Sequence, residues 1–468
     1  MSLQPSERES LERLIGASGT PVRVVSAAQL SGGASRQTFS IETDGGAGRY
    51  VLQRELSAEP RLPNGMADEA LVITEAARLG VPTPVVIGTN LDVADGSDAA
   101  AGEIGRSFFV SEYRDGETIA RRILRDDRFA TARTVLAGQL GTALATLHGG
   151  LDPSRIPWLE ETDELARYRE VADELDLVSP AFELAFRWLA ANTPDGTRTR
   201  RTVVHGDFRL GNLIIDEDGL AAVIDWELAH IGDPMEDLGW VCVRAWRFGG
   251  PKPVAGMGDH EEFFAAYEAA SGTPVDREAV TWWETLGTLK WGIMCGTQSN
   301  RHLSGDVPSV ELAAIGPRVA EQEYDVLRLI APRLITGGGG ERVDSAVGQS
   351  LGTGGAEGGG RPSASDLVDA VRRFLTDDVM AATTGRTGFH ARVAANALAT
   401  VGRELALREA MTANRTARLG ALGFNSERDL ATAIRKGAVD DRLEQVTDAV
   451  YDLVVHRLSV NNPRWIES

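Results

Sequence analysis

The feature that most constrains this chain is a strand–turn–strand pattern with a polar residue at each end. The pattern covers residues 213–224, with two short apolar runs on either side of an Asp/Glu/Gly turn, and it predicts a β-hairpin. Asn212 stands just before the hairpin, Asp225 just after it, and Asp207 five positions before Asn212. Because the open ends of a hairpin lie side by side, we expect Asn212 and Asp225 to be close together.

These residue types suit phosphoryl transfer. In that reaction one carboxylate orients the attacking hydroxyl and accepts its proton, while an Asn and a second Asp hold magnesium. The spacing from Asp207 to Asn212 equals the D-x-x-x-x-N spacing of protein-kinase catalytic loops, with His205-Gly206 in place of the usual His-Arg. Carboxylates at hairpin ends are also ordinary turn residues. The ordered set nevertheless predicts Asp207 as the catalytic base and Asn212 and Asp225 as metal ligands.

At these positions the sequence resembles the aminoglycoside phosphotransferase and choline kinase branch of the kinase-like superfamily. The runs 205–212, 224–227 and 232–238 match the hallmark of that family, and the likeness covers about residues 20–335. It is strongest to the subgroup associated with acyl-CoA dehydrogenases. The resemblance implies an α+β, bilobal protein-kinase-like fold with a β-rich N-lobe and a mainly helical C-lobe. It also implies ATP and Mg²⁺ as cofactors, and Asp237 as the residue that binds the backbone amides of the catalytic loop.

A small-residue turn and a predicted hinge are the candidate nucleotide contacts. The turn lies between two strand-like runs, and its backbone N–H groups can approach phosphates because its residues are small. The hinge follows a buried strand that ends near residue 112. The residues chosen are Gly32, Gly33 and Ser35 in the turn, and Glu112 and Tyr113 at the hinge.

The third strand lacks the lysine that protein kinases use to pair with the ATP phosphates and a helix glutamate. Lysine occurs only at positions 252, 290 and 436. We therefore expect Arg54 to replace it, because Arg stays cationic and grips phosphate with two hydrogen bonds, and Gln53 to point to the opposite face. The resemblance implies Glu69 as the partner of Arg54. The alternative is a first-turn Glu that only favours the helix dipole.

Bulk composition excludes some classes of protein. The 43% hydrophobic and 25% charged content is ordinary for a globular chain. A net charge of −20 argues against a nucleic-acid groove, which needs a basic face. Cys242 and Cys295 form no metal-binding spacing, and no apolar run of about 18 residues is present. We therefore expect a cytoplasmic protein with no nucleic-acid or membrane partner.

Composition also predicts the domain organisation. Residues 337–360 contain 11 glycines in 24 positions, which indicates a flexible linker. After it, three amphipathic segments predict an all-α bundle. A homodimer formed through this bundle, binding of another partner and covering of the active site are all open roles for it. The expected domains are the nucleotide-binding N-lobe 1–113, the catalytic and acceptor-binding C-lobe 114–336, the linker 337–360 and the helical domain 361–468.

The primary functional hypothesis is an ATP- and magnesium-dependent kinase that phosphorylates a hydroxyl group of a small molecule. The resemblance to the acyl-CoA-dehydrogenase-associated subgroup suggests a hydroxyacyl-type metabolite as the acceptor. Two alternatives remain. One is a catalytically silent, nucleotide-binding scaffold, suggested by the missing lysine and the appended bundle. The other is an aminoglycoside-modifying kinase.

Overall fold

The protein is described from a computed structural model. The residues that it describes are 3–17, 21–32, 36–44, 48–55, 65–92, 104–105, 107–195, 201–336 and 362–467. The chain divides into two compact units, unit 1 from Met1–Thr162 with Pro194–Glu284 and unit 2 from Asp163–Thr193 with Thr285–Ser468. None of the described helices is both long and apolar enough to cross a membrane.

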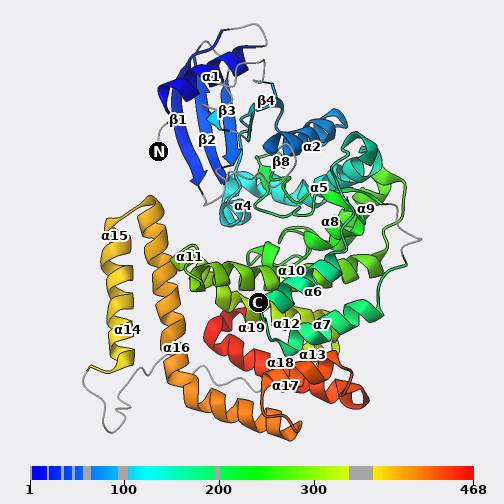
Figure 1. Cartoon of the computed structure of the whole chain (residues 1–468), viewed down its shortest axis with the longest axis vertical. Coiled ribbons are helices and arrows are strands. Elements are labelled where there is room, and N and C mark those ends of the chain that lie inside the picture. The colour runs from blue at the N-terminus through cyan, green and yellow to red at the C-terminus, as the bar shows by residue number, and fades with distance from the viewer. Residues whose placement is uncertain are drawn as a thin grey trace. The chain divides into compact units, whose positions relative to one another are not determined.

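Unit 1 begins with a five-stranded antiparallel sheet in the spatial order β1-β2-β3-β5-β4 (Figure 1). Its strands are β1 (Val24–Gly32), β2 (Arg36–Thr43), β3 (Arg49–Glu55), β4 (Val86–Thr89) and β5 (Phe108–Glu112). Helix α1 (Pro5–Gly16) precedes the sheet and α2 (Met66–Arg78) follows β3. The insertion of β5 between β3 and β4 is a long-range pairing that the sequence order does not predict.

The two faces of this sheet pack against different helices. Leu52 and Phe108 share a core with Leu11 and Leu14 of α1, whereas Phe109 belongs to the cluster that contains Ile73 of α2. Successive side chains of a strand point to opposite faces, so neighbouring residues of β5 enter different cores. Strand β5 is therefore apolar on both sides, as its continuous hydrophobic run predicts.

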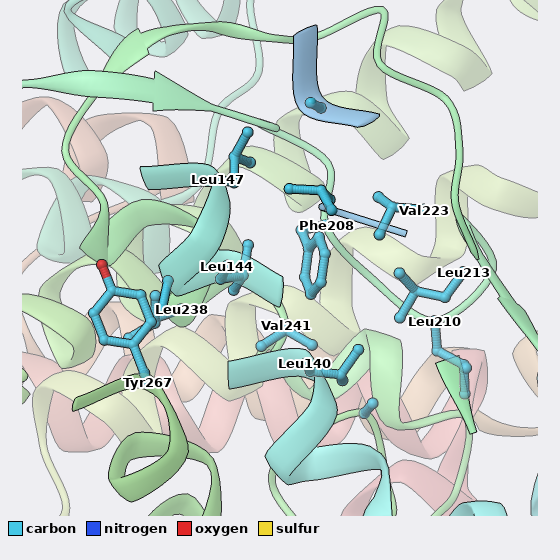
Figure 2. Packing of buried hydrophobic residues seen from close by; sticks show 14 of the residues in the cluster. Leu140, Leu144, Leu147, Phe208, Leu210, Leu213, Val223, Leu238, Val241 and Tyr267 are labelled. Atoms are coloured by element: carbon cyan, nitrogen blue, oxygen red, sulfur yellow. The ribbon is translucent and has the colours of Figure 1, made fainter. Parts of the chain in front are cut away.

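The rest of unit 1 carries the segment with Asp207, Asn212 and Asp225. Its elements are α4 (Ala120–Arg125), α5 (Ala130–Gly150), β6 (Thr202–Val204), β7 (Leu213–Ile215), β8 (Leu220–Val223), β9 (His230–Gly232), α8 (Met235–Trp240), α9 (His260–Ser271) and the first turns of α10 (Arg277–Leu303). The expected hairpin is confirmed: β7 and β8 pair antiparallel, with Leu213 opposite Val223. Figure 2 shows how Leu140 and Leu144 of α5 pack beneath the loop that joins β6 to β7.

Unit 2 is helical in its described part. Its elements are α6 (Glu164–Glu174), α7 (Pro180–Ala191), the remainder of α10, α11 (Val310–Ile315), α12 (Val319–Ile330), α13 (Arg333–Thr336), α14 (Ala364–Arg373), α15 (Met380–Ala382), α16 (Gly385–Ala421), α17 (Glu427–Arg435), α18 (Leu443–Asn461) and α19 (Pro463–Glu467).

The C-terminal helices share one hydrophobic core with helices that precede the linker. Leu430 of α17 and Val450 of α18 cluster with Leu184 of α7 and Leu327 of α12. The helices expected in this tail are present, and the longest of those described is α16. The glycine-rich segment 337–360 lies outside the described residues, and the domain boundaries suggested by composition stay predictions.

Candidate active site

The loop between β6 and β7 holds its polar side chains above a buried apolar base. Phe208 and Leu210 are buried in the same cluster as Leu140 and Leu144 of α5 (Figure 2). The residues that alternate with them are only partly buried. Because apolar and polar positions alternate along this loop, packing of the apolar pair turns Asp207 away from the core.

The residues before Asp207 are held by backbone geometry and burial. Gly206 has a positive φ of 75°, and a Cβ there would lie 2.4 Å from the carbonyl oxygen of Leu228. Only glycine fits such a position without strain. The ring of His205 is buried, its Nε2 lies 3.1 Å from the carbonyl oxygen of Ile224, and its Nδ1 accepts the N–H of Asp207 at 3.2 Å. Burial lowers the pKa of His205, which favours the neutral ring that this pattern of bonds requires.

A buried carboxylate binds the amides of the loop, as the resemblance implied. Asp237 of α8 accepts the N–H of His205 at 2.8 Å and that of Gly206 at 2.9 Å. His148 of α5 bonds to the same carboxylate through Nε2 at 3.1 Å, and its Nδ1 bonds to the hydroxyl of Tyr267 at 3.1 Å. Burial alone would raise the pKa of Asp237, but the bonds from His148 and from the backbone hold it below its ordinary value. The backbone of the loop at His205 and Gly206 is therefore held by the ionised carboxylate of Asp237.

The carboxylate of Asp207 receives three side-chain hydrogen bonds. Arg209 Nε donates to Oδ1 at 2.9 Å, and Trp240 Nε1 donates to the same oxygen at 2.8 Å. Asn212 donates to Oδ2 through its amide nitrogen. These donors fix the orientation of Asp207, and they also fix Asn212 with its amide oxygen directed away from Asp207.

Asp225 lies beside Asn212, as the hairpin predicts. The N–H of Ile224 donates to the carbonyl oxygen of Asn212 at 2.9 Å, which brings the next residue to the end of the hairpin where Asn212 stands. Asp225 has a positive φ of 67°, a strained conformation for a residue with a side chain and one often found at functional sites. Burial, together with the charges of Glu227 and Asp207, raises the pKa of Asp225 to about 6.

The donor set at this end of the hairpin suits magnesium. Asn212 and Asp225 offer hard oxygen ligands, and magnesium is usually held by one or two protein groups with phosphate and water completing its shell. Burial, and after it the charges of Glu227 and Asp207, raise the pKa of Asp225, and a cation bound beside it would oppose both effects. Among the described residues no group of three or more His, Cys, Asp or Glu could hold a metal ion by itself. Asn212 and Asp225 together fit a magnesium site with two protein ligands.

The expected pair between Arg54 and Glu69 is wrong. Arg54 lies on the face of the sheet that meets α1, where its Nη1 bonds to Glu7 and to the carbonyl oxygen of Ile104, and its Nε bonds to Gln37 at 3.0 Å. The physical reason is strand alternation, which sends Arg54 to the same side as Leu52 and away from α2.

Glu69 instead pairs with Arg36, the first residue of β2. The distance from Arg36 Nη2 to Glu69 Oε2 is 3.0 Å, and the same nitrogen lies 3.2 Å from Glu227 Oε2. Arg36 Nη1 lies 3.9 Å from Asp225 Oδ1. Glu69 is buried rather than exposed in a first turn, and burial raises its pKa to about 7 against the opposing effect of Arg36. The helix glutamate is thus part of the site, with a different cation.

The remaining predicted contacts are only partly described. Gly32 ends β1, whereas Gly33 and Ser35 lie outside the described residues. Glu112 ends β5 and donates its N–H to Val85, and the N–H of Tyr113 donates to Arg49. Both hinge amides are bonded within the chain. The predicted contact between the backbone at this hinge and adenine stays a prediction.

Sequence reasoning gave no role at this site to four residues: Trp240, His148, Arg209 and Arg36. Trp240 and His148 reach the loop from helices outside it, whereas Arg209 lies within the loop. Arg36 had one usable signal, since it is a cation directly after the small-residue turn and at the start of a strand.

Comparison with known proteins assigns the chain to a family. A family model described as Phosphotransferase enzyme family (APH) matches residues 26–283, more than half of the chain. The chain belongs to this phosphotransferase family. A second model, described as a domain of unknown function (DUF6285), matches residues 381–465 of the phosphotransferase, which is the helical tail.

Two curated relatives confirm the likeness to the acyl-CoA-dehydrogenase-associated subgroup. The phosphotransferase is 28% identical over 301 residues to acyl-CoA dehydrogenase family member 10 of Mus musculus, covering 58% of this chain and 26% of that protein. It is 30% identical over 257 residues to acyl-CoA dehydrogenase family member 11 of Gallus gallus, covering 50% of this chain and 30% of that protein. The chain therefore spans less than a third of the length of these relatives.

A solved structure confirms the expected kinase-like fold. A Ralstonia eutropha protein described as a candidate aminoglycoside phosphotransferase aligns with a TM-score of 0.55 at 21% sequence identity. The alignment covers 69% of the phosphotransferase and 98% of the solved chain. At this identity the likeness concerns the fold alone.

Proposed function

We propose that this phosphotransferase transfers a phosphoryl group from ATP, in the presence of magnesium, to a hydroxyl group of a small molecule. The observation that supports it most directly is the meeting of Asp207, Asn212 and Asp225 at one end of a hairpin. Hydrogen bonds to the backbone or to neighbouring side chains orient the first two, and a hairpin hydrogen bond beside Asn212 places the third. Family membership supports the same reaction type.

Asn212 and Asp225 would hold the magnesium ion. Bound there, the ion would neutralise charge that develops on the transferred phosphoryl group. The chain supports this role in advance, because Asp225 is held in a strained backbone conformation and near other carboxylates. Folding therefore already orders the side chains that would hold magnesium, and less entropy is lost when the ion binds.

Asp207 would accept the proton of the acceptor hydroxyl. Its Oδ1 already accepts from Arg209 and Trp240, and its Oδ2 accepts from Asn212. Carboxylate oxygens have further acceptor sites, so a hydroxyl can still donate to Asp207. The donors keep the carboxylate oriented, and the attachment of the loop to Asp237 keeps its backbone in place.

The acceptor that we propose is a hydroxyacyl-type metabolite. The names of both curated relatives refer to acyl-CoA dehydrogenases, which act on acyl thioesters. A hydroxyacyl thioester is the related compound that carries a hydroxyl group able to accept phosphate. Aminoglycosides are the second class to test. The pair between Arg36 and Glu69 puts a cation beside the helix glutamate, so the missing lysine argues less strongly for a catalytically silent scaffold.

Phosphate transfer from ATP tests the proposal. The full-length chain is incubated with magnesium, γ-labelled ATP and a panel of hydroxyacyl thioesters, simple alcohols and aminoglycosides. We expect transfer to at least one hydroxyl compound. Asp207→Asn should lower kcat by about 100- to 10,000-fold, the usual contribution of a general base, and leave ATP affinity nearly unchanged.

Asp216→Asn is the matched control, because it is the same substitution in the turn of the same hairpin. Asp216 Oδ1 accepts the N–H groups of Asp218 and Gly219 at 2.8 and 3.0 Å, and an Asn oxygen can accept both. Its activity should match the wild type. Full activity in Asp207→Asn, or a wild-type chain that neither binds ATP nor transfers phosphate, would contradict the proposal.

A further inference from the structure

At position 53, strand β3 presents an amide rather than a cation on the side of the sheet that faces α2. The register pairs Gln53 with Thr38, and Glu55 with Arg36. Directly paired residues of antiparallel strands point to the same side. Gln53 also pairs with Phe109, which packs in the cluster that contains α2 residues. Arg49 of β3 lies on this side too but pairs with Asp115, so the cation beside Glu69 comes from β2.

Arg36 reaches both the helix glutamate and the proposed metal ligand. Its guanidinium lies 3.0 Å from Glu69, 3.2 Å from Glu227 and 3.9 Å from Asp225. One planar group thus spans from α2 to the end of the catalytic hairpin. We propose that Arg36 is the phosphate-binding cation of this site. Strand β2 would then supply the phosphate contact that a lysine on β3 supplies in other kinase-like chains.

The surroundings of Arg36 suit a phosphate-binding role. Glu69 is buried and needs a nearby positive charge, so it holds the guanidinium in place. The side chain of Arg36 is still 25% exposed, which leaves part of it accessible. Glu227 and Asp225 would repel a polyphosphate, and a guanidinium between them and α2 offsets that repulsion. Its fork of N–H groups matches two phosphate oxygens at once.

This inference rests on the proposed function, because it assumes that ATP phosphates lie next to Asp225. The test is calorimetric titration of the full-length chain with Mg·ATP and, separately, with adenosine. Arg36→Gln should weaken Mg·ATP binding by about 10- to 100-fold, the range for one charge-assisted hydrogen bond. Adenosine binding should change by less than about twofold, because adenosine has no phosphate to contact. Arg36→Lys keeps the charge and should lose less than about tenfold.

Two further variants separate a phosphate contact from a structural ion pair. Arg36→Gln combined with Gln53→Arg returns the cation to β3 on the same side of the sheet, and it should recover most of the lost Mg·ATP affinity. Arg54→Gln is the matched control, because Arg54 lies on the neighbouring strand and faces α1. It should lower thermal stability through loss of its pair with Glu7, and leave Mg·ATP affinity within about twofold of the wild type.

The possible results distinguish the two proposals. If the wild type binds Mg·ATP and Arg36→Gln binds it equally well, Arg36 has no phosphate-binding role. Equal losses for Mg·ATP and adenosine, or a double variant that recovers nothing, would also overturn it. Should Arg36→Gln fail to fold, Arg36→Lys and the double variant decide the question, since the first keeps a cation at position 36 and the second keeps one on the same side of the sheet. A wild type that does not bind Mg·ATP refutes the proposed function itself, and this inference with it.

Discussion

Replacement of Asp237 by Asn tests how the catalytic loop is held. The buried carboxylate accepts hydrogen bonds from the N–H groups of His205 and Gly206 and from Nε2 of His148. An Asn side chain has the same shape but keeps only one acceptor oxygen, and its NH₂ group would face one of these donors. The substitution therefore changes the bonding of the loop and leaves Asp207 unaltered.

The expected loss of stability follows from these contacts. A hydrogen bond to a charged group contributes about 1.5–3 kcal/mol, and a buried donor left without a partner costs about 1–3 kcal/mol. Breaking a buried charged network by altering one member typically costs about 3–5 kcal/mol, so we expect a value in that range. For a unit of 150–250 residues each kcal/mol lowers Tm by roughly 2–4 °C, which gives a decrease of roughly 6–20 °C.

Differential scanning calorimetry measures the change in Tm, and amide hydrogen exchange of residues 202–212 reports on the loop itself. We expect faster exchange at His205 and Gly206. Asp233→Asn is the control, because Asp233 is also buried near the start of α8 and accepts the N–H of Met235 at 2.9 Å. An Asn side chain keeps an oxygen that can accept this N–H, so its Tm should stay close to wild type. An unchanged Tm and unchanged exchange in Asp237→Asn would refute the reasoning.

Two further predictions concern the same loop. Gly206→Ala should lower the free energy of unfolding by about 2–5 kcal/mol, because its φ is positive and its Cβ would contact Leu228. Gly249→Ala is the control: its φ is 84°, but its Cβ would have nothing within 4 Å, so it should cost about 1–2 kcal/mol. Denaturant titration of both variants checks this, and equal costs would argue against the contact. Tyr267→Phe removes the hydroxyl that bonds to His148 and should cost about 1–2 kcal/mol by the same titration, and a variant as stable as the wild type would mean that the bond contributes nothing.

Much of the fold follows from local pattern. The period-2 and period-3.6 spacing of apolar residues identifies the strands and helices around the site, and the turn at 216–219 closes the expected hairpin. The placement of Asn212 beside Asp225 follows from that hairpin alone. The role of Asp237 followed from the family resemblance, and the structure confirms it.

The identity of the cation beside Glu69 could not be predicted from local sequence pattern. Alternation along β3 correctly separates Gln53 from Arg54, but it cannot say which of the two faces α2. That choice depends on which helix covers which side of the sheet, and here α1 covers the side of Arg54. Arg36 meets Glu69 only because β2 pairs with β3 in one register and α2 packs across the other side.

The order and spacing of Asp207, Asn212 and Asp225 are therefore properties of the sequence, since a short hairpin brings its own ends together. The cation, the Trp240 donor to Asp207 and the His148 bond to Asp237 are decided by tertiary structure. Arg36, Trp240 and His148 reach the site from elements far apart in the chain, and their meeting depends on packing between those elements rather than on any local preference.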